Sequence, residues 1–369
     1  MHTWWGADNG KGSRCMKKLF ACLAVLAAAG AAGAADAWRP PERWRGFNLL
    51  EMFTWHEGAK MPAYQEDDFR MMKEWGFNFA RLPIDYRFWT HGGDWNAIDE
   101  EWVKPVDRAI ELGAKYGIHV QVNLHRAPGY CVNRGELEPE KLFEGSENAR
   151  KAFTKHWEFL ARRYAAIPVE RLSFDLVNEP ANVDEAKYVA CVRPAIDAIR
   201  AVSPDRLIVS DGLSWGNQPA MSLAGERGIA QAMRGYLPMQ VSHYRAEWVN
   251  GYNAPPVWPL ERKGEKVRYD DPSLDWMYVN NFRKWDALAA RGAFVMMGEF
   301  GVYNKTPHDM SLKMLEANLK LLKERGWGWA LWNLRGSFGP LDSSRADVEY
   351  EDFRGHKLDR KMLDLLRRY

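Results

Sequence analysis

Two glutamates stand where carboxyl groups could act as a pair. Glu179 lies near the end of segment 174–180 and Glu299 within segment 296–301, and each follows an apolar run typical of a buried strand. Cleavage of a glycosidic bond with retention needs one carboxylate that attacks and one carboxylic acid that donates a proton. Either glutamate alone would equally fit a strand-terminal carboxylate facing water or an arginine. Two of them on separate strands favour acid/base and nucleophilic chemistry.

The elements that would position this pair follow a repeating pattern. Segments 103–114, 153–164, 188–199, 278–289 and 312–322 have the apolar spacing of helices, and Gly76, Gly117, Gly292 and Gly326 each follow a helical stretch. Strand-like runs recur eight times, at Arg45–Glu51, Asn78–Ile84, His119–His125, Leu172–Asn178, Arg206–Asp211, Met239–Tyr244, Ala293–Glu299 and Gly328–Asn333. This alternation predicts an α/β fold, a single-domain (β/α)8 TIM barrel over residues 38–369. The first strand is not followed by the glycine-rich motif of a dinucleotide-binding sheet.

The predicted strand ends carry polar and aromatic side chains. In a barrel of parallel strands these ends share one mouth, where active sites form. The long stretches 126–148 and 245–275 follow the third and sixth predicted strands and would lie over that mouth. The residues at the strand ends are Glu51, Arg81, His125, Asn178 with Glu179, His243 with Tyr244, Glu299, and Trp332.

In the order of these motifs, the chain resembles glycoside hydrolase family 5, the cellulase family of retaining barrel enzymes. The resemblance covers nearly the whole chain after its first 37 residues, and the ordered set is more specific than any one member. The matching motifs are Arg81-Leu82-Pro83, Asn123-Leu124-His125, Asn178-Glu179-Pro180, Gly298-Glu299-Phe300-Gly301 and Trp332.

The resemblance implies a role for each matching residue. It makes Glu179 the acid/base and Glu299 the nucleophile. We expect burial beside aromatic side chains to raise the pKa of Glu179, and Arg81 to favour the ionised form of Glu299. Asn178 would bind the sugar 2-hydroxyl. His125 and Trp332 would line the subsite of the sugar whose bond is cleaved, although each of these three could instead be structural.

The sixth predicted strand departs from the family pattern. The family places a tyrosine two residues after a histidine, so that both side chains point inward, whereas here His243 and Tyr244 are adjacent. Neighbouring side chains on a regular strand face opposite sides. We predict His243 as the inward residue, with Tyr244 as its partner that would donate to Glu299.

These observations predict a glycoside hydrolase that cleaves a β-linked oligo- or polysaccharide by double displacement, in the manner of an endoglucanase. A transglycosylase and a non-catalytic carbohydrate-binding protein on the same fold are the alternatives. Specificity depends on loop shapes that no motif encodes, so the glycan, its linkage and endo or exo action stay open.

The bulk composition is compatible with this function. Eighteen Trp residues and 13% aromatic content suit stacking on sugar rings. No metal-binding spacing and no phosphate loop occur, so we expect neither a metal nor a cofactor. Aromatic and acidic residues in segments near the mouth could line sugar subsites, with plain packing as the equal alternative: Glu51, Phe53, Trp55, Trp89, Trp215 and Trp248.

Residues 1–37 have the pattern of a signal peptide region, with a basic start at Met16-Lys17-Lys18, an apolar stretch and small-residue cleavage options. Met16 is the predicted true start, and the protein is predicted to be exported, either secreted or periplasmic, with no stable membrane span. Cleavage after Ala35 would remove four Lys or Arg and one Asp, so the formal charge would fall from +2 to −1. This near-neutral charge argues against a nucleic-acid partner. The oligomeric state and a disulfide between Cys131 and Cys191 stay open.

Overall fold

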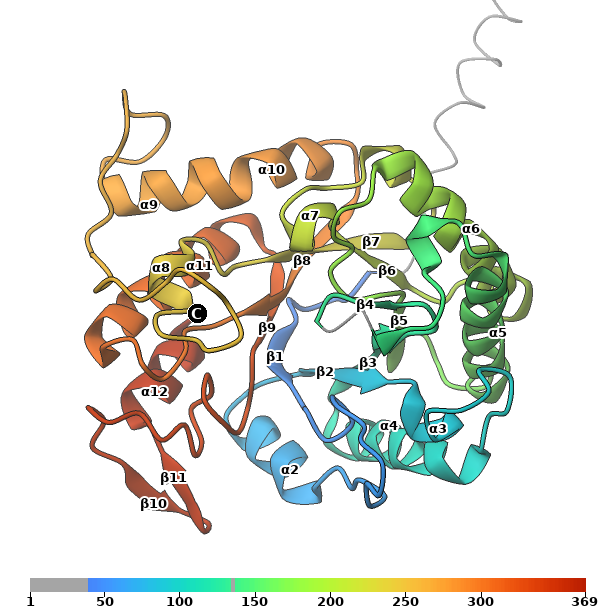
Figure 1. Cartoon of the computed structure of the whole chain (residues 1–369). Helices are drawn as coiled ribbons and strands as arrows, with labels where there is room; N and C mark the ends of the chain where they lie inside the picture. Colours follow the sequence, from blue (N-terminus) through green and yellow to red (C-terminus); the bar gives the residue numbers. More distant parts are fainter. Residues whose placement is uncertain (1–38, 134–136) are drawn as a thin grey trace, which may run out of the picture. The chain divides into compact units, whose positions relative to one another are not determined.

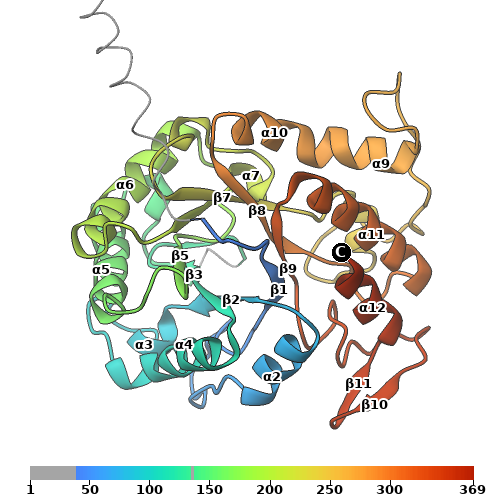
Figure 2. The ribbon, with the colours of Figure 1, turned by 180° about the vertical axis from the view of Figure 1, so that it is seen from behind.

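The computed structural model describes residues 39–133 and 137–369. The predicted signal peptide region lies outside these residues. Figure 1 shows a ring of strands surrounded by helices, and Figure 2 shows the same ring from behind. The chain therefore alternates strand and helix as its apolar patterns predict.

In the described part of the chain, eight parallel strands form a closed barrel, because β2 pairs with both β1 and β3 and the remaining strands follow in order. This confirms the predicted (β/α)8 fold. The barrel strands are β1 (Arg45–Asn48), β2 (Phe79–Asp85), β3 (His119–Ala127), β5 (Leu172–Asp175), β6 (Ile208–Asp211), β7 (Ile229–Arg234), β8 (Phe294–Phe300) and β9 (Gly328–Leu331). Outside the barrel, β4 (Tyr130–Cys131) pairs with β3, and β10 (Glu351–Phe353) forms a hairpin with β11 (His356–Leu358).

The helices pack around the barrel and bury their apolar faces against it. Ser146 and Asp184 cap the first turns of α5 and α6 with their side-chain oxygens, and Gly117 and Gly326 end α4 and α11 with positive φ, as their type favours. The helices are α2 (Glu66–Glu74), α3 (Arg87–Thr90), α4 (Lys104–Tyr116), α5 (Glu147–Arg163), α6 (Glu185–Val202), α7 (Leu213–Gly216), α8 (Met239–Ser242), α9 (Pro272–Met277), α10 (Arg283–Ala289), α11 (His308–Arg325) and α12 (Arg360–Arg368).

The predicted sixth strand, Met239–Tyr244, is wrong. This segment follows Pro238 and forms the short helix α8, and the sixth barrel strand is β7, ten residues earlier at Ile229–Arg234. Its inward positions are Ala230 and Ala232, which join the apolar cluster inside the barrel. Alanine has a low preference for strands, but a crowded barrel interior favours a small side chain. The sequence pattern of β7 is weak for this reason.

None of the helices in the described residues is long and apolar enough to cross a membrane. Cys131 and Cys191 are both buried free thiols, so the disulfide that the sequence left open is absent from this structure. The Cys191 thiol instead donates to the carbonyl oxygen of Leu142 at 3.3 Å.

Candidate active site

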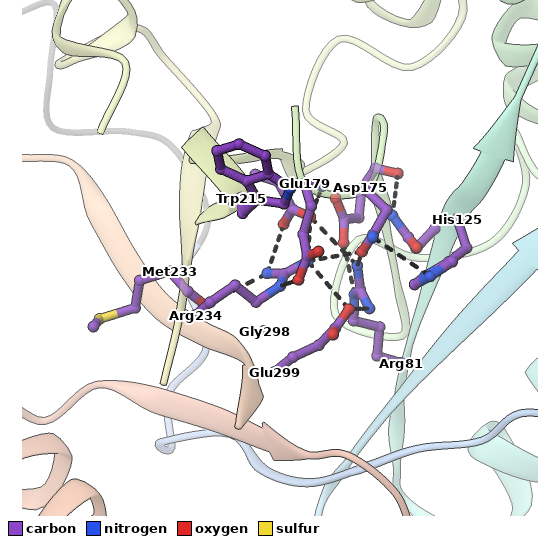
Figure 3. A network of polar contacts seen from close by, with 12 residues as sticks. Arg81, His125, Asp175, Glu179, Trp215, Met233, Arg234, Gly298 and Glu299 are labelled. Atoms are coloured by element: carbon purple, nitrogen blue, oxygen red, sulfur yellow. Dashed lines mark hydrogen bonds and ion pairs between the residues drawn. The ribbon is translucent and has the colours of Figure 1, made fainter. Parts of the chain in front are cut away.

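The structure brings Glu179 and Glu299 together at the carboxyl-terminal mouth of the barrel. Glu299 lies in β8 and its residue is 3% exposed, whereas Glu179 follows β5 and its side chain is 15% exposed. Figure 3 shows the two carboxyl groups approaching one another from opposite sides of a shared polar network. Both are therefore held by the protein, and Glu179 keeps more access to solvent.

A bulge in β8 points Glu299 into the barrel. Met297 pairs with Met233 of β7, but the next partner of β7 is Glu299, so Gly298 is an extra residue in the ladder. Met296 points into the barrel interior, and regular alternation would therefore turn Gly298 inward and Glu299 outward. The bulge reverses this alternation, which is how strands re-aim side chains next to active sites.

Arg81, at the barrel mouth, donates hydrogen bonds to Glu299 and to Asn178, two residues that the sequence predicts for the site. It is fully buried and donates from Nη1 to Glu299 Oε1 at 2.6 Å, from Nε to Asp175 Oδ2 at 2.8 Å, and from Nη2 to Asn178 Oδ1 at 3.0 Å. A planar guanidinium with fixed donors orients such partners as well as neutralising them. The expectation that Arg81 contacts Glu299 is thus met by direct hydrogen bonding.

A second buried arginine, Arg234 at the end of β7, was missed from the sequence. Its Nε donates to Glu179 Oε1 at 2.8 Å, and its Nη2 donates to Glu299 Oε1 at 3.2 Å and to Asn178 Oδ1 at 2.8 Å. Its guanidinium also pairs with both carboxylate oxygens of Asp211 at the end of β6. One planar group therefore bridges both glutamates (Figure 3).

The tyrosine that contacts Glu299 is Tyr236, not Tyr244. The Tyr236 hydroxyl donates to Glu299 Oε2 at 3.1 Å. Tyr244 instead lies next to Arg245, whose guanidinium is 5.1 Å from its ring centroid. His243 is buried and packs its ring edge-on to Tyr236 at 5.0 Å between centroids. The family pattern places its tyrosine two residues after the preceding site residue, and Arg234-Gly235-Tyr236 has this spacing. The prediction missed it because it placed the sixth strand at Met239–Tyr244.

His125 and Trp332 adjoin the network from the other side. The rings of His125 and Trp332 stack at 5.5 Å between centroids, and Phe53 packs edge-on to both. Both arginines donate to Asn178 Oδ1, so its Nδ2 faces His125 Nε2 at 3.4 Å. Burial lowers the pKa of His125 well below its usual value, which favours a neutral ring. The structure therefore brings most of the predicted substrate-binding residues together around the two glutamates, with Tyr244 as the exception. These residues are Arg81, His125, Asn178, His243 and Trp332.

The protonation of Glu179 follows from its surroundings. Burial, followed by the negative charges of Glu299 and Asp211, raises the pKa of the Glu179 carboxyl to about 8, against the lowering effect of Arg234. Burial, with the charge of Asp211, also raises the pKa of Asp175 to about 7. Four carboxyl groups share two arginines here, so full ionisation would leave an excess of negative charge. Glu179 is the group in this cluster that is suited to hold a proton at neutral pH.

The residues proposed to line subsites differ in exposure. Trp89 is fully buried and donates to His156, so packing explains it. Trp215 and Trp248 are about half exposed, at 47% and 54%, and remain available for stacking. Glu51 accepts from Arg335 at 2.7 Å and lines a hollow of about 400 Å³. That hollow also includes Asn48, whose side chain accepts from Arg81, and Asp342.

The described residues contain no group of three or more His, Cys, Asp or Glu side chains that could hold a metal ion. The side chains that meet at the site carry carboxyl, guanidinium, amide, phenol and imidazole groups. These groups can attack, donate and accept protons, and orient sugar hydroxyls.

Comparison with known proteins gives the site its context. The profile of the family described as Cellulase (glycosyl hydrolase family 5) matches residues 35–337. The chain belongs to glycosyl hydrolase family 5. As a family member it is an enzyme that hydrolyses O-glycosyl bonds, as its sequence motifs predicted.

Several relatives of this chain are named for the cleavage of glucans. Cellodextrinase A of Ruminococcus flavefaciens is 26% identical over 71% of this chain and 76% of its own length. Endoglucanase C of Acetivibrio thermocellus is 26% identical over 73% of this chain and 83% of its own length.

Solved structures share the barrel. A crystal structure of a glycoside hydrolase is 36% identical with a TM-score of 0.80, covering 88% of this chain and 99% of that one. Endoglucanase Cel5A of Thermotoga maritima is 24% identical with a TM-score of 0.68, covering 88% and 96%, and has the same fold.

Replacing Tyr236 by Phe tests the corrected tyrosine. The variant loses the hydrogen bond to Glu299 Oε2, and we expect kcat to fall roughly tenfold to a hundredfold, since a hydrogen bond to a charged group contributes about 1.5–3 kcal/mol. Tyr244→Phe is the matched control and should retain nearly full activity. Initial rates of glycoside hydrolysis check both; the reverse ranking of the two variants would contradict the assignment.

The raised pKa of Glu179 also predicts how stability depends on pH. The folded protein binds this proton more tightly than the unfolded chain, whose carboxyl has an ordinary pKa of 4.5. The stabilisation is complete below about pH 4.5 and is lost as the pH rises toward 8. Each pKa unit corresponds to about 1.4 kcal/mol.

The melting temperature of Glu179→Gln minus that of the wild type should therefore increase from pH 5 to pH 8. We expect this increase to be roughly 2–4 °C or more, because only the wild type loses the stabilisation by its bound proton. Calorimetry at both pH values measures this difference. The same exchange at Glu158, on the exposed face of α5, serves as the control and should show no such trend. A difference for Glu179→Gln that stays constant with pH would show that its carboxyl is not held protonated.

Proposed function

We propose that the protein is a retaining β-glycoside hydrolase that cleaves a β-linked glucan oligo- or polysaccharide by double displacement. The observation that carries this proposal is the pair of carboxyls, with Glu299 buried and Glu179 partly exposed, that one guanidinium bridges at the barrel mouth. Glu299 accepts hydrogen bonds from Arg81, Arg234 and Tyr236, which hold its carboxyl group in the position that a nucleophile needs. Glu179 has a pKa raised to about 8, which suits a proton donor at neutral pH.

In the first half of the proposed reaction, Glu299 attacks the anomeric carbon while Glu179 protonates the departing oxygen. In the second half, Glu179 removes a proton from water as that water attacks the glycosyl ester of Glu299. Both arginines hold the side-chain oxygen of Asn178, and one N–H of its Nδ2 faces His125 Nε2 at 3.4 Å, so the second N–H can donate to a sugar hydroxyl. The exposed Trp215 and Trp248 could stack on neighbouring sugar rings.

Cellodextrinase A and endoglucanase C, the two relatives described above, have names that support a β-glucan substrate. The experiment is hydrolysis by purified protein of soluble β-glucans, mannans and xylans, with Glu299→Gln as the inactive control. Proton NMR of the first product formed should detect the β-anomer before it mutarotates. Release of the α-anomer would exclude double displacement, and silence on every polymer would argue against polysaccharide hydrolysis. Longer products at high substrate concentration would favour transglycosylation.

A further inference from the structure

Arg234 contributes a fixed positive charge at a place where the family pattern has a histidine two residues before a tyrosine. In this chain the tyrosine of that pattern is Tyr236, so Arg234 replaces the histidine. Imidazole can be neutral at neutral pH, but guanidinium is always charged. The exchange therefore puts a permanent cation in contact with both catalytic glutamates proposed above.

The surrounding backbone accommodates the larger side chain. A Cβ atom on Gly298 would lie 2.9 Å from Arg234 Nη1, and one on Gly216 would lie 2.4 Å from Arg234 Cγ. Ser214, Trp215 and Gly216 all have positive φ, which bends α7 beside the arginine. Figure 3 shows Trp215 next to the end of Arg234 that meets Glu179. Arg234 is thus built into the site rather than tolerated at its edge.

The charges around Glu179 change during the proposed reaction. In the free enzyme the anionic neighbours Glu299 and Asp211 counter the attraction of Arg234, and Glu179 keeps its proton. Esterification of Glu299 removes one negative charge from this cluster, while Arg234 stays charged and 2.8 Å from Glu179 Oε1. Among the described residues, the other charged, titratable or hydrogen-bonding groups that face Glu179 or its cluster come from several elements. They are Arg81 from β2, His125 from β3, Tyr130 from β4, Asp175 from β5, Asn178 after β5, Tyr236 after β7 and His243 after α8.

We propose that Arg234 is a positioning residue for the second half of the reaction, in which it holds Glu179 ionised and aimed as the base once Glu299 carries the sugar. The inference rests on the proposed double displacement. In this step a bond forms between the water oxygen and the anomeric carbon, and the bond from that carbon to Glu299 breaks. Its electron pair returns to the Glu299 carboxylate, and the proton of water passes to Glu179.

The test separates the two halves with 2,4-dinitrophenyl β-cellobioside. Its leaving group needs no proton, so hydrolysis of the glycosyl enzyme limits kcat. In Arg234→Gln we expect kcat to fall about tenfold or more. KM should fall as well, because the glycosyl enzyme accumulates, and kcat/KM should fall by a smaller factor than kcat, because Arg81 and Tyr236 still hold Glu299 in the first half of the reaction. Azide, a nucleophile that needs no base, should restore kcat and yield the glycosyl azide.

Control variants separate the effect of the charge at Arg234 from a general effect of losing an arginine. Arg234→Lys retains the charge, so we expect it to lose less kcat than Arg234→Gln and to respond less to azide. Arg193→Gln removes an arginine that pairs with Glu226 on the outside of the barrel and should behave as wild type. If Arg234→Gln does not fold, as judged by circular dichroism, Arg234→His replaces it, because histidine is the residue of the family pattern. The His variant should respond to azide more strongly above pH 7 than at pH 5, where the imidazole is charged.

A parallel loss of kcat and kcat/KM without an azide response would overturn the proposal, because it would mean that Arg234 only maintains the shape of the site. Unchanged kinetics would overturn it as well. Hydrolysis by the wild type and the azide response of the variant are separate readouts. Failure of the first would contradict the proposed function, whereas failure of the second alone would contradict only the role of Arg234.

Discussion

Glu299→Gln should abolish turnover, with kcat lower by a factor on the order of 10⁴ or more, as expected for loss of a nucleophile. The amide has nearly the shape of the carboxylate but cannot form the glycosyl ester. The variant should stay folded, because Arg81 keeps Asp175 and Asn178 as partners and Arg234 keeps Asp211. Release of reducing sugar measures the loss, and the melting temperature checks the fold.

Glu226→Gln provides a matched control for this exchange. Glu226 also pairs with an arginine, Arg193, but on the outside of the barrel. Its replacement should leave kcat within about twofold, because a surface ion pair contributes about 0–1 kcal/mol and does not touch the site. Retention of more than a few per cent of activity by a folded Glu299→Gln would contradict the assignment of the nucleophile.

Glu179→Ala should have an effect that depends on the leaving group. For a poor leaving group such as an alcohol or a sugar, we expect kcat/KM to fall by roughly 10²–10⁴, the usual contribution of general acid catalysis. For 2,4-dinitrophenol, which departs without a proton, kcat/KM should fall much less. The smaller side chain also opens space for azide at the second step, so azide should accelerate turnover and form a glycosyl azide.

The control for this variant is Glu158→Ala, which removes an exposed glutamate of α5 and should match wild type on both substrates. A plot of log kcat/KM against the pKa of the leaving group should be steeper for Glu179→Ala than for wild type. Equal slopes would exclude Glu179 as the proton donor. Loss of azide acceleration in a folded variant would argue against its role as the base.

The barrel and most of the site could be predicted because their signals are local. Each strand is a short apolar run, and side chains at the carboxyl ends of parallel strands must share one mouth. This reasoning places Arg81, His125, Asn178, Glu179 and Glu299 together before any coordinates are known. Their contacts, such as the hydrogen bond from Arg81 to Glu299, follow from that shared position.

What could not be predicted depends on neighbours distant in sequence. The inward Ala230 and Ala232 of β7 are set by the narrow barrel interior, and the bulge at Gly298 depends on pairing between β7 and β8. Because the sequence pattern of β7 is weak, the prediction assigns to His243 and Tyr244 the positions that Arg234 and Tyr236 occupy in the structure. The sequence did offer one signal for β7: Arg234 directly follows a short and mostly apolar segment, residues 229–233.

The central claim is that Glu299 forms a covalent bond with the sugar. The most direct measurement is incubation of the protein with 2,4-dinitrophenyl 2-deoxy-2-fluoro-β-cellobioside, followed by mass spectrometry of the intact protein and of its peptides. The fluorine slows both steps and the good leaving group speeds the first, so the glycosyl enzyme should accumulate. We expect one added fluorocellobiosyl group on the peptide that contains Glu299, and none in Glu299→Gln. Label on Glu179, or turnover without any labelled protein, would contradict the claim.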